Sequence, residues 1–223
     1  MFVSLPSRHK SSLRWATPVL FASLWLAFLW VEMRPDALQA PLLQQWGALT
    51  GMNAAPDWRT GLRLVTALFL HADWAHLLGN LVFLLIFGLP AERAMGPWRF
   101  LLLFVLGGAM SNLAAALTLP GPDNVIIGAS GAVSAVIGAY LALFPNAKLG
   151  VVLPLGLFLE FVKAPASLLI GIWALLQVVF AYIGPAFGAV AWSAHIAGFL
   201  FGVVFALFVR AAIARRMRKR QGY

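Results

Sequence analysis

The stretch Asn124–Phe144 reads NVIIGASGAVSAVIGAYLALF and contains no charged residue. A transmembrane α-helix needs about 20 consecutive, predominantly apolar residues. Two hydroxyl side chains, Ser130 and Ser134, interrupt this apolar run and lie four residues apart, which is the spacing of one helical face. The stretch therefore predicts a membrane-spanning helix that carries polar groups on one side.

Outward from this stretch, the chain contains five more long apolar runs. They are Ala16–Met33, Trp74–Pro90, Trp98–Leu119, Ala164–Ile183 and Val190–Ala212. Because lipid offers no hydrogen bonds to the backbone, a chain crosses it as helices or as a closed barrel, and these runs lack the strict alternation of barrel strands. We therefore predict an all-α membrane protein, a bundle of six transmembrane helices.

The composition agrees with a chain that is solvated largely by lipid. Of 223 residues, 62% are hydrophobic and only 10% are charged, whereas a soluble domain has roughly 25% charged residues. The sequence predicts one six-span domain at residues 16–212, between a basic segment at 1–15 and a basic tail at 213–223. The absence of cysteine excludes disulfides and a cysteine nucleophile.

Positive charge marks one side of the predicted membrane domain. The net charge is +9. Six cationic residues lie at or beyond the end of the last span: Arg210, Arg215, Arg216, Arg218, Lys219 and Arg220. Lys and Arg are enriched in cytoplasmic flanks, so we predict that both termini are cytoplasmic. The placement of this charge beside a span argues against a nucleic-acid partner and for the lipid bilayer.

Polar side chains within spans are costly and indicate function. We single out His76 and Asn80 in the second span, Ser130 in the fourth, and His195 in the sixth. Counted from the predicted outer ends of their spans, Ser130, His195 and Asn80 lie about five to seven residues deep, or roughly 8–10 Å at the rise of a helix. These side chains are therefore expected to share one shallow layer below the outer surface.

Small residues favour close contact between two of these spans. Gly198 and Gly202 form a G-x-x-x-G pattern beside His195, and such patterns let membrane helices approach closely. A contact between the fourth and sixth spans would bring His195 to Ser130. A serine needs a neighbouring base to act as a nucleophile, and an imidazole suits that task near neutral pH. We therefore predict a Ser–His dyad, with Asn80 and His76 as donors to the oxyanion.

These motifs resemble those of the rhomboid family. The similarity consists of His71-x4-His76-x3-Asn80, Glu92-x3-Gly96, Gly128-Ala-Ser130-Gly131 and Ala194-His195-x2-Gly198, in that order, over roughly Leu62 to Gly202. Gly138-Ala-Tyr140 and Phe144-Pro145 are similar to a common bacterial subgroup. Some members place an aromatic residue four positions after the serine, where this chain has Ser134.

The resemblance implies a six-helix intramembrane serine endopeptidase in which Ser130 and His195 are catalytic. His76 and Asn80 match oxyanion-stabilising positions, and Glu92 matches a structural position on the cytoplasmic side. It further implies substrates that are transmembrane proteins, cut within or beside a span, with no cofactor or metal, and placement in a bacterial inner membrane.

Two other functions stay open. A catalytically silent scaffold that binds client transmembrane segments would share the fold, and a small transporter or proton relay could use the histidines. The oligomeric state does not follow from the sequence.

Overall fold

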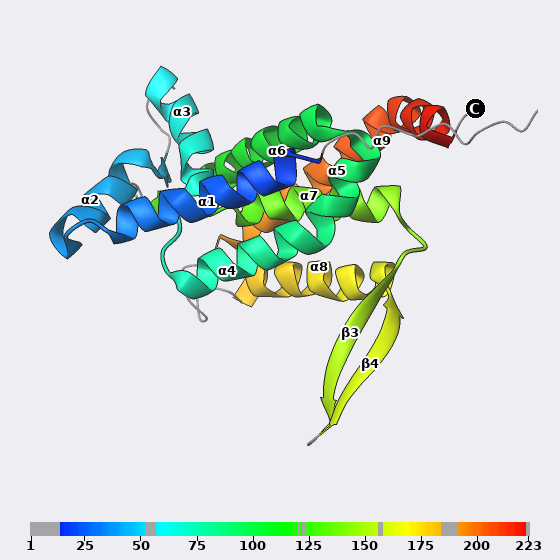
Figure 1. The fold of residues 1–223 in the computed structure, drawn as a ribbon. Helices are drawn as coiled ribbons and strands as arrows, with labels where there is room; N and C mark the ends of the chain where they lie inside the picture. The colour runs from blue at the N-terminus through cyan, green and yellow to red at the C-terminus, as the bar shows by residue number, and fades with distance from the viewer. Residues whose placement is uncertain are drawn as a thin grey trace, which may run out of the picture.

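The computed structural model describes residues 14–51, 57–119, 121, 124–155, 158–183 and 191–221, with the side chains of 151–161 and 216–221 excluded. Six apolar helical segments occupy the six predicted ranges and run roughly side by side (Figure 1). Their bounds are α1 Ala16–Glu32, α4–η2–α5 Trp74–Met95, α6 Pro97–Thr118, α7 Ser130–Leu143, α8 Ala166–Ile183 and α9 Trp192–Gln221. The protein is thus a helical membrane protein, as predicted.

Four of the six segments are long and apolar enough to cross a bilayer unaided, namely Trp74–Met95, α6, α8 and Trp192–Arg215 of α9. The helices α1 and α7 are shorter, with 17 and 14 residues. At a rise of 1.5 Å per residue, α7 is only about 21 Å long. The helix α7 is nevertheless the centre of the bundle, because every side chain from Gly131 to Tyr140 is buried.

Several predicted span boundaries are wrong. The fourth span begins as a helix at Ser130 and not at Asn124, because Val125–Ile126 form the strand β2 and Gly128 has a φ of +116°. The second span continues past Pro90 to Met95, since a π-helical turn, η2 Leu84–Gly88, precedes the proline near the start of α5. The helix α9 continues beyond Ala212 to Gln221.

The segment between α1 and α4 carries its own secondary structure at one end of the bundle (Figure 1). It comprises α2 Asp36–Trp46, β1 Ala48–Leu49, α3 Trp58–Thr66 and the 3-10 turn η1 Ala67–Phe69. The strand β1 pairs antiparallel with β2, with Ala48 opposite Ile126. Arg63 donates to the carbonyls of Gln44 and Gln45 and so joins α3 to the end of α2.

A β-hairpin projects from the opposite end of the bundle (Figure 1). Its strands are β3 Lys148–Leu155 and β4 Phe158–Pro165, and they pair antiparallel from Lys148 opposite Pro165. The apolar runs of the sequence do not predict this hairpin. The two small sheets are additions to a helical fold.

A buried carboxylate fixes the start of α1. The Glu92 side chain is 1% exposed, and its two oxygens accept hydrogen bonds at 2.9 Å from the backbone N–H groups of Ala16 and Thr17. The first N–H groups of a helix have no partner within the helix, and a negative charge there is favourable. Glu92 therefore has a structural contact that fits the position implied by the motif.

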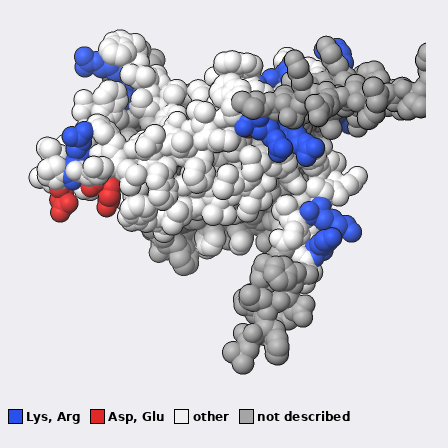
Figure 2. Space-filling view, viewed as in Figure 1, with Lys and Arg blue, Asp and Glu red and all other residues white. Residues whose placement is uncertain are grey.

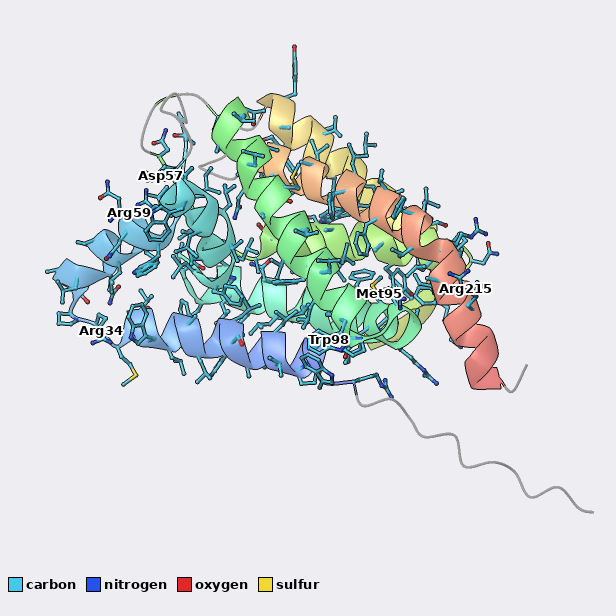
Figure 3. The ribbon with its side chains drawn as sticks, turned by 90° about the horizontal axis from the view of Figure 1, so that it is seen from above. Arg34, Asp57, Arg59, Met95, Trp98 and Arg215 are labelled. Carbon is cyan, nitrogen blue, oxygen red and sulfur yellow. The ribbon has the colours of Figure 1, made fainter. Side chains whose placement is uncertain are left out.

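Charges divide the two ends of the molecule. On the face shown in Figure 2, acidic side chains appear only at the end that carries α2, together with some Lys and Arg, whereas the other end and the base of the hairpin show Lys and Arg alone. From a second direction, Arg34, Asp57 and Arg59 lie at one end and Arg215 at the other (Figure 3). The predicted basic segment 1–15 lies outside the described residues, except for its last two.

Candidate active site

Ser130 is the first residue of α7, at the end of the bundle that carries α2 and α3. The residues before it turn sharply at Gly128, whose φ of +116° is a conformation that side-chain-bearing residues rarely adopt. The Gly128 N–H donates to the Ala67 carbonyl at 2.9 Å, which holds the turn in place. The chain thus presents a half-buried serine hydroxyl at a helix N-terminus.

Ser130 Oγ lies 2.8 Å from His195 Nε2, a hydrogen-bonding distance, although 65 residues separate the two. The hydroxyl donates to Nε2 when the imidazole carries its proton on Nδ1. His195 is the fourth residue of α9, so both groups come from the same end of their helices. The structure brings together the two residues that the sequence places in a pair.

Glycines allow this approach. A Cβ added to Gly198 would overlap the Gly131 carbonyl oxygen, and one added to Gly202 would overlap the Ala135 carbonyl oxygen. From the other helix, a Cβ on Gly138 would overlap the Phe199 carbonyl oxygen. The predicted close contact between the fourth and sixth spans is therefore confirmed, and it places backbone against backbone.

The remaining ring nitrogen of His195 also has a partner. Its Nδ1 lies 2.7 Å from Oε1 of Gln177, a residue of α8 that is 7% exposed. A carbonyl oxygen only accepts hydrogen bonds, so this contact matches a proton on Nδ1 and an unprotonated Nε2. The Trp192 ring packs edge-on against the imidazole, with centroids 5.7 Å apart.

The prediction of functional polar side chains within spans misses Gln177. The same rule that selects His76 and Ser130 would have selected it, because a glutamine in an apolar span is costly unless paired. It also misses Ser111 and Asn112, which are buried in α6. Trp192, and not the residue four positions after Ser130, supplies the aromatic contact to His195, while Ser134 Oγ donates to the Ser130 carbonyl at 2.7 Å.

His76 and Asn80 lie one turn apart on α4. The imidazole of His76 faces Gly128 so closely that an added Cβ would lie 2.5 Å from its Nε2. The amide nitrogen of Asn80 is buried and has no hydrogen-bond partner among the described residues. A buried donor without a partner is costly, and the Asn80 amide thus has hydrogen-bonding capacity that the described residues do not use.

His71 supports the turn before Ser130. Its Nε2 accepts from the Ala129 N–H at 3.4 Å, and its ring packs edge-on against His76 with centroids 5.0 Å apart. Burial, with a smaller contribution from neighbouring His76, lowers the pKa of His71 to about 3. His71 is therefore neutral near pH 7, as an acceptor to a backbone N–H must be.

The predicted depth of Ser130 within a helical span is wrong. Ser130 begins its helix, so it is not six residues into a helical span. His195 is three residues beyond the first residue of α9 and Asn80 six beyond that of α4, or about 5 Å and 9 Å along their helices. The polar groups still lie near the same end of the bundle, because the preceding turn at Gly128 takes the place of the first predicted helical turns.

The Rhomboid domain family matches residues 59–212 of this chain, which contain every residue of the site just described. The chain belongs to the rhomboid family. This confirms the family resemblance drawn from the motifs, and it places the protein in a family that includes intramembrane serine proteases.

Similar rhomboid proteins occur in bacteria and plants. A Bacillus subtilis protein named provisionally as rhomboid protease YdcA is 36% identical over 134 residues, which are 59% of this chain and 63% of that protein. The chloroplastic Rhomboid-like protein 11 of Arabidopsis thaliana is 35% identical over 153 residues, 67% of this chain and 51% of that protein. Rhomboid protease GluP of Bacillus subtilis is 32% identical over 117 residues, 52% of this chain and 22% of that protein.

This rhomboid chain thus covers less than two thirds of the length of each of these relatives.

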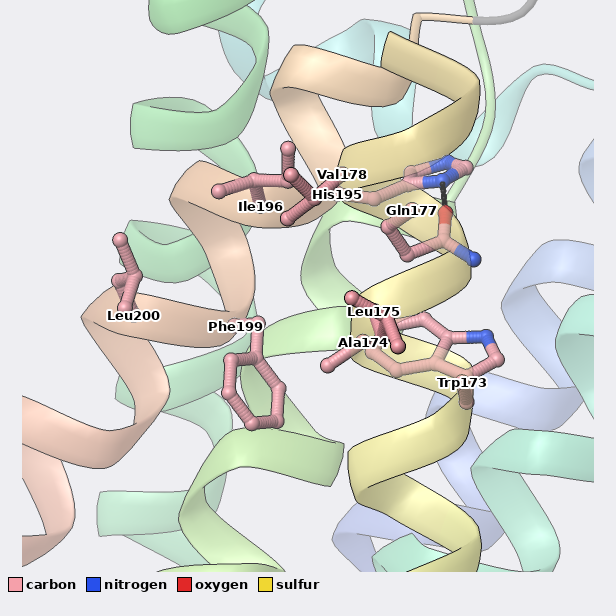
Figure 4. Close-up of a pocket in the computed structure, with 9 residues that line it drawn as sticks. All are labelled: Trp173, Ala174, Leu175, Gln177, Val178, His195, Ile196, Phe199 and Leu200. Carbon is pink, nitrogen blue, oxygen red and sulfur yellow. Dashed lines mark hydrogen bonds between the residues drawn. The ribbon is translucent and has the colours of Figure 1, made fainter. Parts of the chain in front are cut away.

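In this rhomboid protein an apolar cavity of about 220 Å³ lies between α8 and α9, beside His195 (Figure 4). It is lined by Trp173, Ala174, Leu175, Gln177, Val178, His195, Ile196, Phe199 and Leu200. On the other side of α9, the glycines bring its backbone against that of α7. On this side, the side chains of α8 and α9 meet and leave the cavity between them.

Proposed function

We propose that this rhomboid protein is an intramembrane serine endopeptidase in which Ser130 is the nucleophile and His195 the general base. The observation that carries the proposal is the 2.8 Å contact between Ser130 Oγ and His195 Nε2. A serine is activated when it lies within hydrogen-bond reach of a base and a third group orients that base.

The chemistry follows from these positions. Ser130 Oγ attacks the carbonyl carbon of a peptide bond while its proton moves to His195 Nε2, which gives a tetrahedral oxyanion. The C–N bond then breaks, and the proton passes from Nε2 to the leaving amine. Water, deprotonated by the same imidazole, hydrolyses the acyl-enzyme and restores the serine.

The oxyanion needs donors aimed at the oxygen on which charge develops. We assign this task to Asn80 and His76. The buried, unpartnered amide of Asn80 supports the assignment, and so does the position of His76 Nε2 against the turn that precedes Ser130. The Ser130 backbone N–H, at the start of α7, is a further donor because the first N–H groups of a helix are free.

The proposed substrates are transmembrane proteins, cut within or beside a span. The site is built from helices that are apolar on their outer faces, and Leu168, Leu175 and Leu200 are among their exposed side chains. A substrate that reaches Ser130 through this environment would itself be solvated by lipid.

The test compares the wild type with Ser130→Ala in detergent. We expect the wild type to react with a fluorophosphonate probe and to cleave a co-expressed model membrane substrate, and we expect Ser130→Ala to do neither while accumulating at the same level. A wild type that neither labels nor cleaves, but retains the substrate as a bound complex, would instead establish the catalytically silent scaffold.

We further propose a bacterial inner membrane as the location, with both termini in the cytoplasm. The distribution of charge supports this. The helix α5, with exposed Arg93, and the base of the hairpin, with exposed Lys148 and Lys163, lie at the end opposite α2 (Figure 1). Exposed Glu32 ends α1 and exposed Asp36 begins α2, and cytoplasmic flanks are enriched in Lys and Arg. A cytoplasm-active reporter should give signal when fused after Tyr223 and none when inserted after Asn53. The reverse pattern would overturn the orientation.

A further inference from the structure

The side of His195 that faces away from Ser130 contacts a single face of α8. Trp173, Gln177 and Phe180 follow one another at helical spacing on α8, and Trp192, His195 and Phe199 do the same on α9. The two aromatic pairs enclose the polar one: the Phe180 and Trp192 rings stack with centroids 4.9 Å apart, and the Trp173 and Phe199 rings lie 5.9 Å apart. We call these six residues the α8–α9 seam.

Gln177 meets only one polar group of the described residues in this seam. Its Oε1 lies 2.7 Å from His195 Nδ1, and Figure 4 shows the amide oxygen directed at the imidazole. The rest of the cavity around it is apolar. A glutamine in such surroundings is costly without a partner, so its side chain is held at His195.

Neutral His195 can carry its proton on Nδ1 or on Nε2. Only the first of these tautomers leaves Nε2 able to accept the Ser130 proton. An amide oxygen accepts a hydrogen bond and cannot donate one, so it favours the tautomer with a proton on Nδ1. That tautomer leaves Nε2 free to accept from Ser130, 2.8 Å away. In soluble serine proteases a carboxylate on Nδ1 holds the imidazole in this tautomer.

We propose that Gln177 is a positioning residue for His195, which accepts the Nδ1–H hydrogen bond and keeps Nε2 unprotonated toward Ser130. This inference rests on the proposed function. Gln177 lies on the far side of the imidazole from Ser130 and acts through His195. A neutral amide is suited to this place, because it fixes the tautomer without adding a charge to an apolar seam.

The test uses Gln177→Leu, which removes the acceptor, and Gln177→Glu, which keeps an oxygen at the same reach. Val179→Leu, at a neighbouring exposed position of α8, is the matched control. Loss of one neutral hydrogen bond predicts that Gln177→Leu lowers kcat about 2- to 10-fold, with KM unchanged. Gln177→Glu should recover most of the loss, and Val179→Leu should behave as the wild type.

A second measurement is independent of catalysis. In detergent-solubilised protein with ¹⁵N-labelled histidine, the His195 signals, assigned by their loss in His195→Ala, should show the proton on Nδ1. In Gln177→Leu the proportion of the other tautomer should rise. A Gln177→Leu variant with wild-type kcat and unchanged ¹⁵N shifts, and only a lower melting temperature, would make Gln177 a helix-packing residue and overturn the inference.

The two proposals fail differently. If the wild type neither labels nor cleaves, the proposed function fails, and the ¹⁵N shifts alone decide whether Gln177 fixes the tautomer. If the wild type is active and Ser130→Ala inactive, but Gln177→Leu matches Val179→Leu in every measurement, the inference about Gln177 fails alone.

Discussion

The two faces of α9 are packed in opposite ways. Toward α7, Gly198 and Gly202 bring backbone against backbone with no room for a single added carbon. Toward α8, large side chains meet and leave a cavity of about 220 Å³. The residues Ser130 and His195 come from the tightly packed pair of helices, whereas Gln177 comes from the loosely packed one.

This difference has a physical consequence. Backbone contact leaves few alternative arrangements, because moving one helix requires moving the other, and so the distance between nucleophile and base is held by a closely packed pair of helices. Side chains that meet beside a cavity can rearrange at a lower cost in free energy than two backbones in contact. The geometry of Ser130 and His195 is therefore expected to depend on the glycines, and the hydrogen bond to Gln177 on the aromatic pairs around it.

The largest expected effect comes from removing the base. His195→Ala should abolish cleavage of a model membrane substrate and block fluorophosphonate labelling of Ser130, because no other imidazole lies within hydrogen-bonding distance of that hydroxyl in the described part of the chain. The yield of folded protein, measured by size-exclusion chromatography, controls for misfolding. Labelling at the wild-type rate would show that His195 is not the base.

The next effect tests whether Asn80 works in the transition state. Loss of one oxyanion donor costs about 10²–10³ in rate in a soluble protease, and Asn80→Ala should lower kcat by that much or less, since His76 remains. Asn112→Ala is the matched control, because its amide already donates to the Leu64 carbonyl at 2.8 Å.

The comparison between these two asparagines decides the point. Asn112→Ala should lower the melting temperature and keep kcat per probe-reactive molecule. Asn80→Ala should lower kcat per probe-reactive molecule and keep the melting temperature. Equal kcat in both variants, with both destabilised, would remove Asn80 from the site.

A smaller effect on stability tests how tightly α7 and α9 are packed. Gly202→Val adds carbons where one already overlaps the Ala135 carbonyl, and overpacking costs about 1–3 kcal/mol. Gly171→Val on α8 has no atom within 4 Å of its added Cβ and should cost little. Unfolding in mixed detergent micelles would compare the two. Equal destabilisation would mean that the contact between α7 and α9 tolerates added carbons as well as an exposed position of α8 does.

The smallest effect concerns pH and His71. Because the pKa of His71 is about 3 in the folded protein and ordinary in the unfolded chain, the unfolded chain binds more protons between these values. The contribution of neutral His71 to the free energy of unfolding is therefore fully present above about pH 6.5 and is lost as the pH falls below that value. Between pH 7.5 and 5.5 the loss is about 1 kcal/mol.

His71→Gln lacks this proton linkage, so its free energy of unfolding should fall less over the same pH interval. A variant with the same pH dependence as the wild type would show that His71 is not kept neutral by burial.

Much of the site could be predicted because its residues violate a local rule. His76, Asn80, Ser130 and His195 are polar in apolar runs, and lipid penalises each of them wherever the helices pack. Gln177 violates the same rule and was open to the same reasoning. Boundaries were less predictable: the start of α7 depends on the φ of Gly128 and on the pairing of β2 with β1, neither of which an apolar run reveals.

The sequence by itself determined that the chain is a helical membrane protein of the rhomboid type, since apolar length and ordered motifs are local properties that need no partner. Only the tertiary structure decided which groups meet. The 2.8 Å between Ser130 and His195 and the 2.7 Å between His195 and Gln177 join α7, α9 and α8. Such distances depend on how helices far apart in the sequence cross, and that is set by the shapes of their packed faces and not by any single segment.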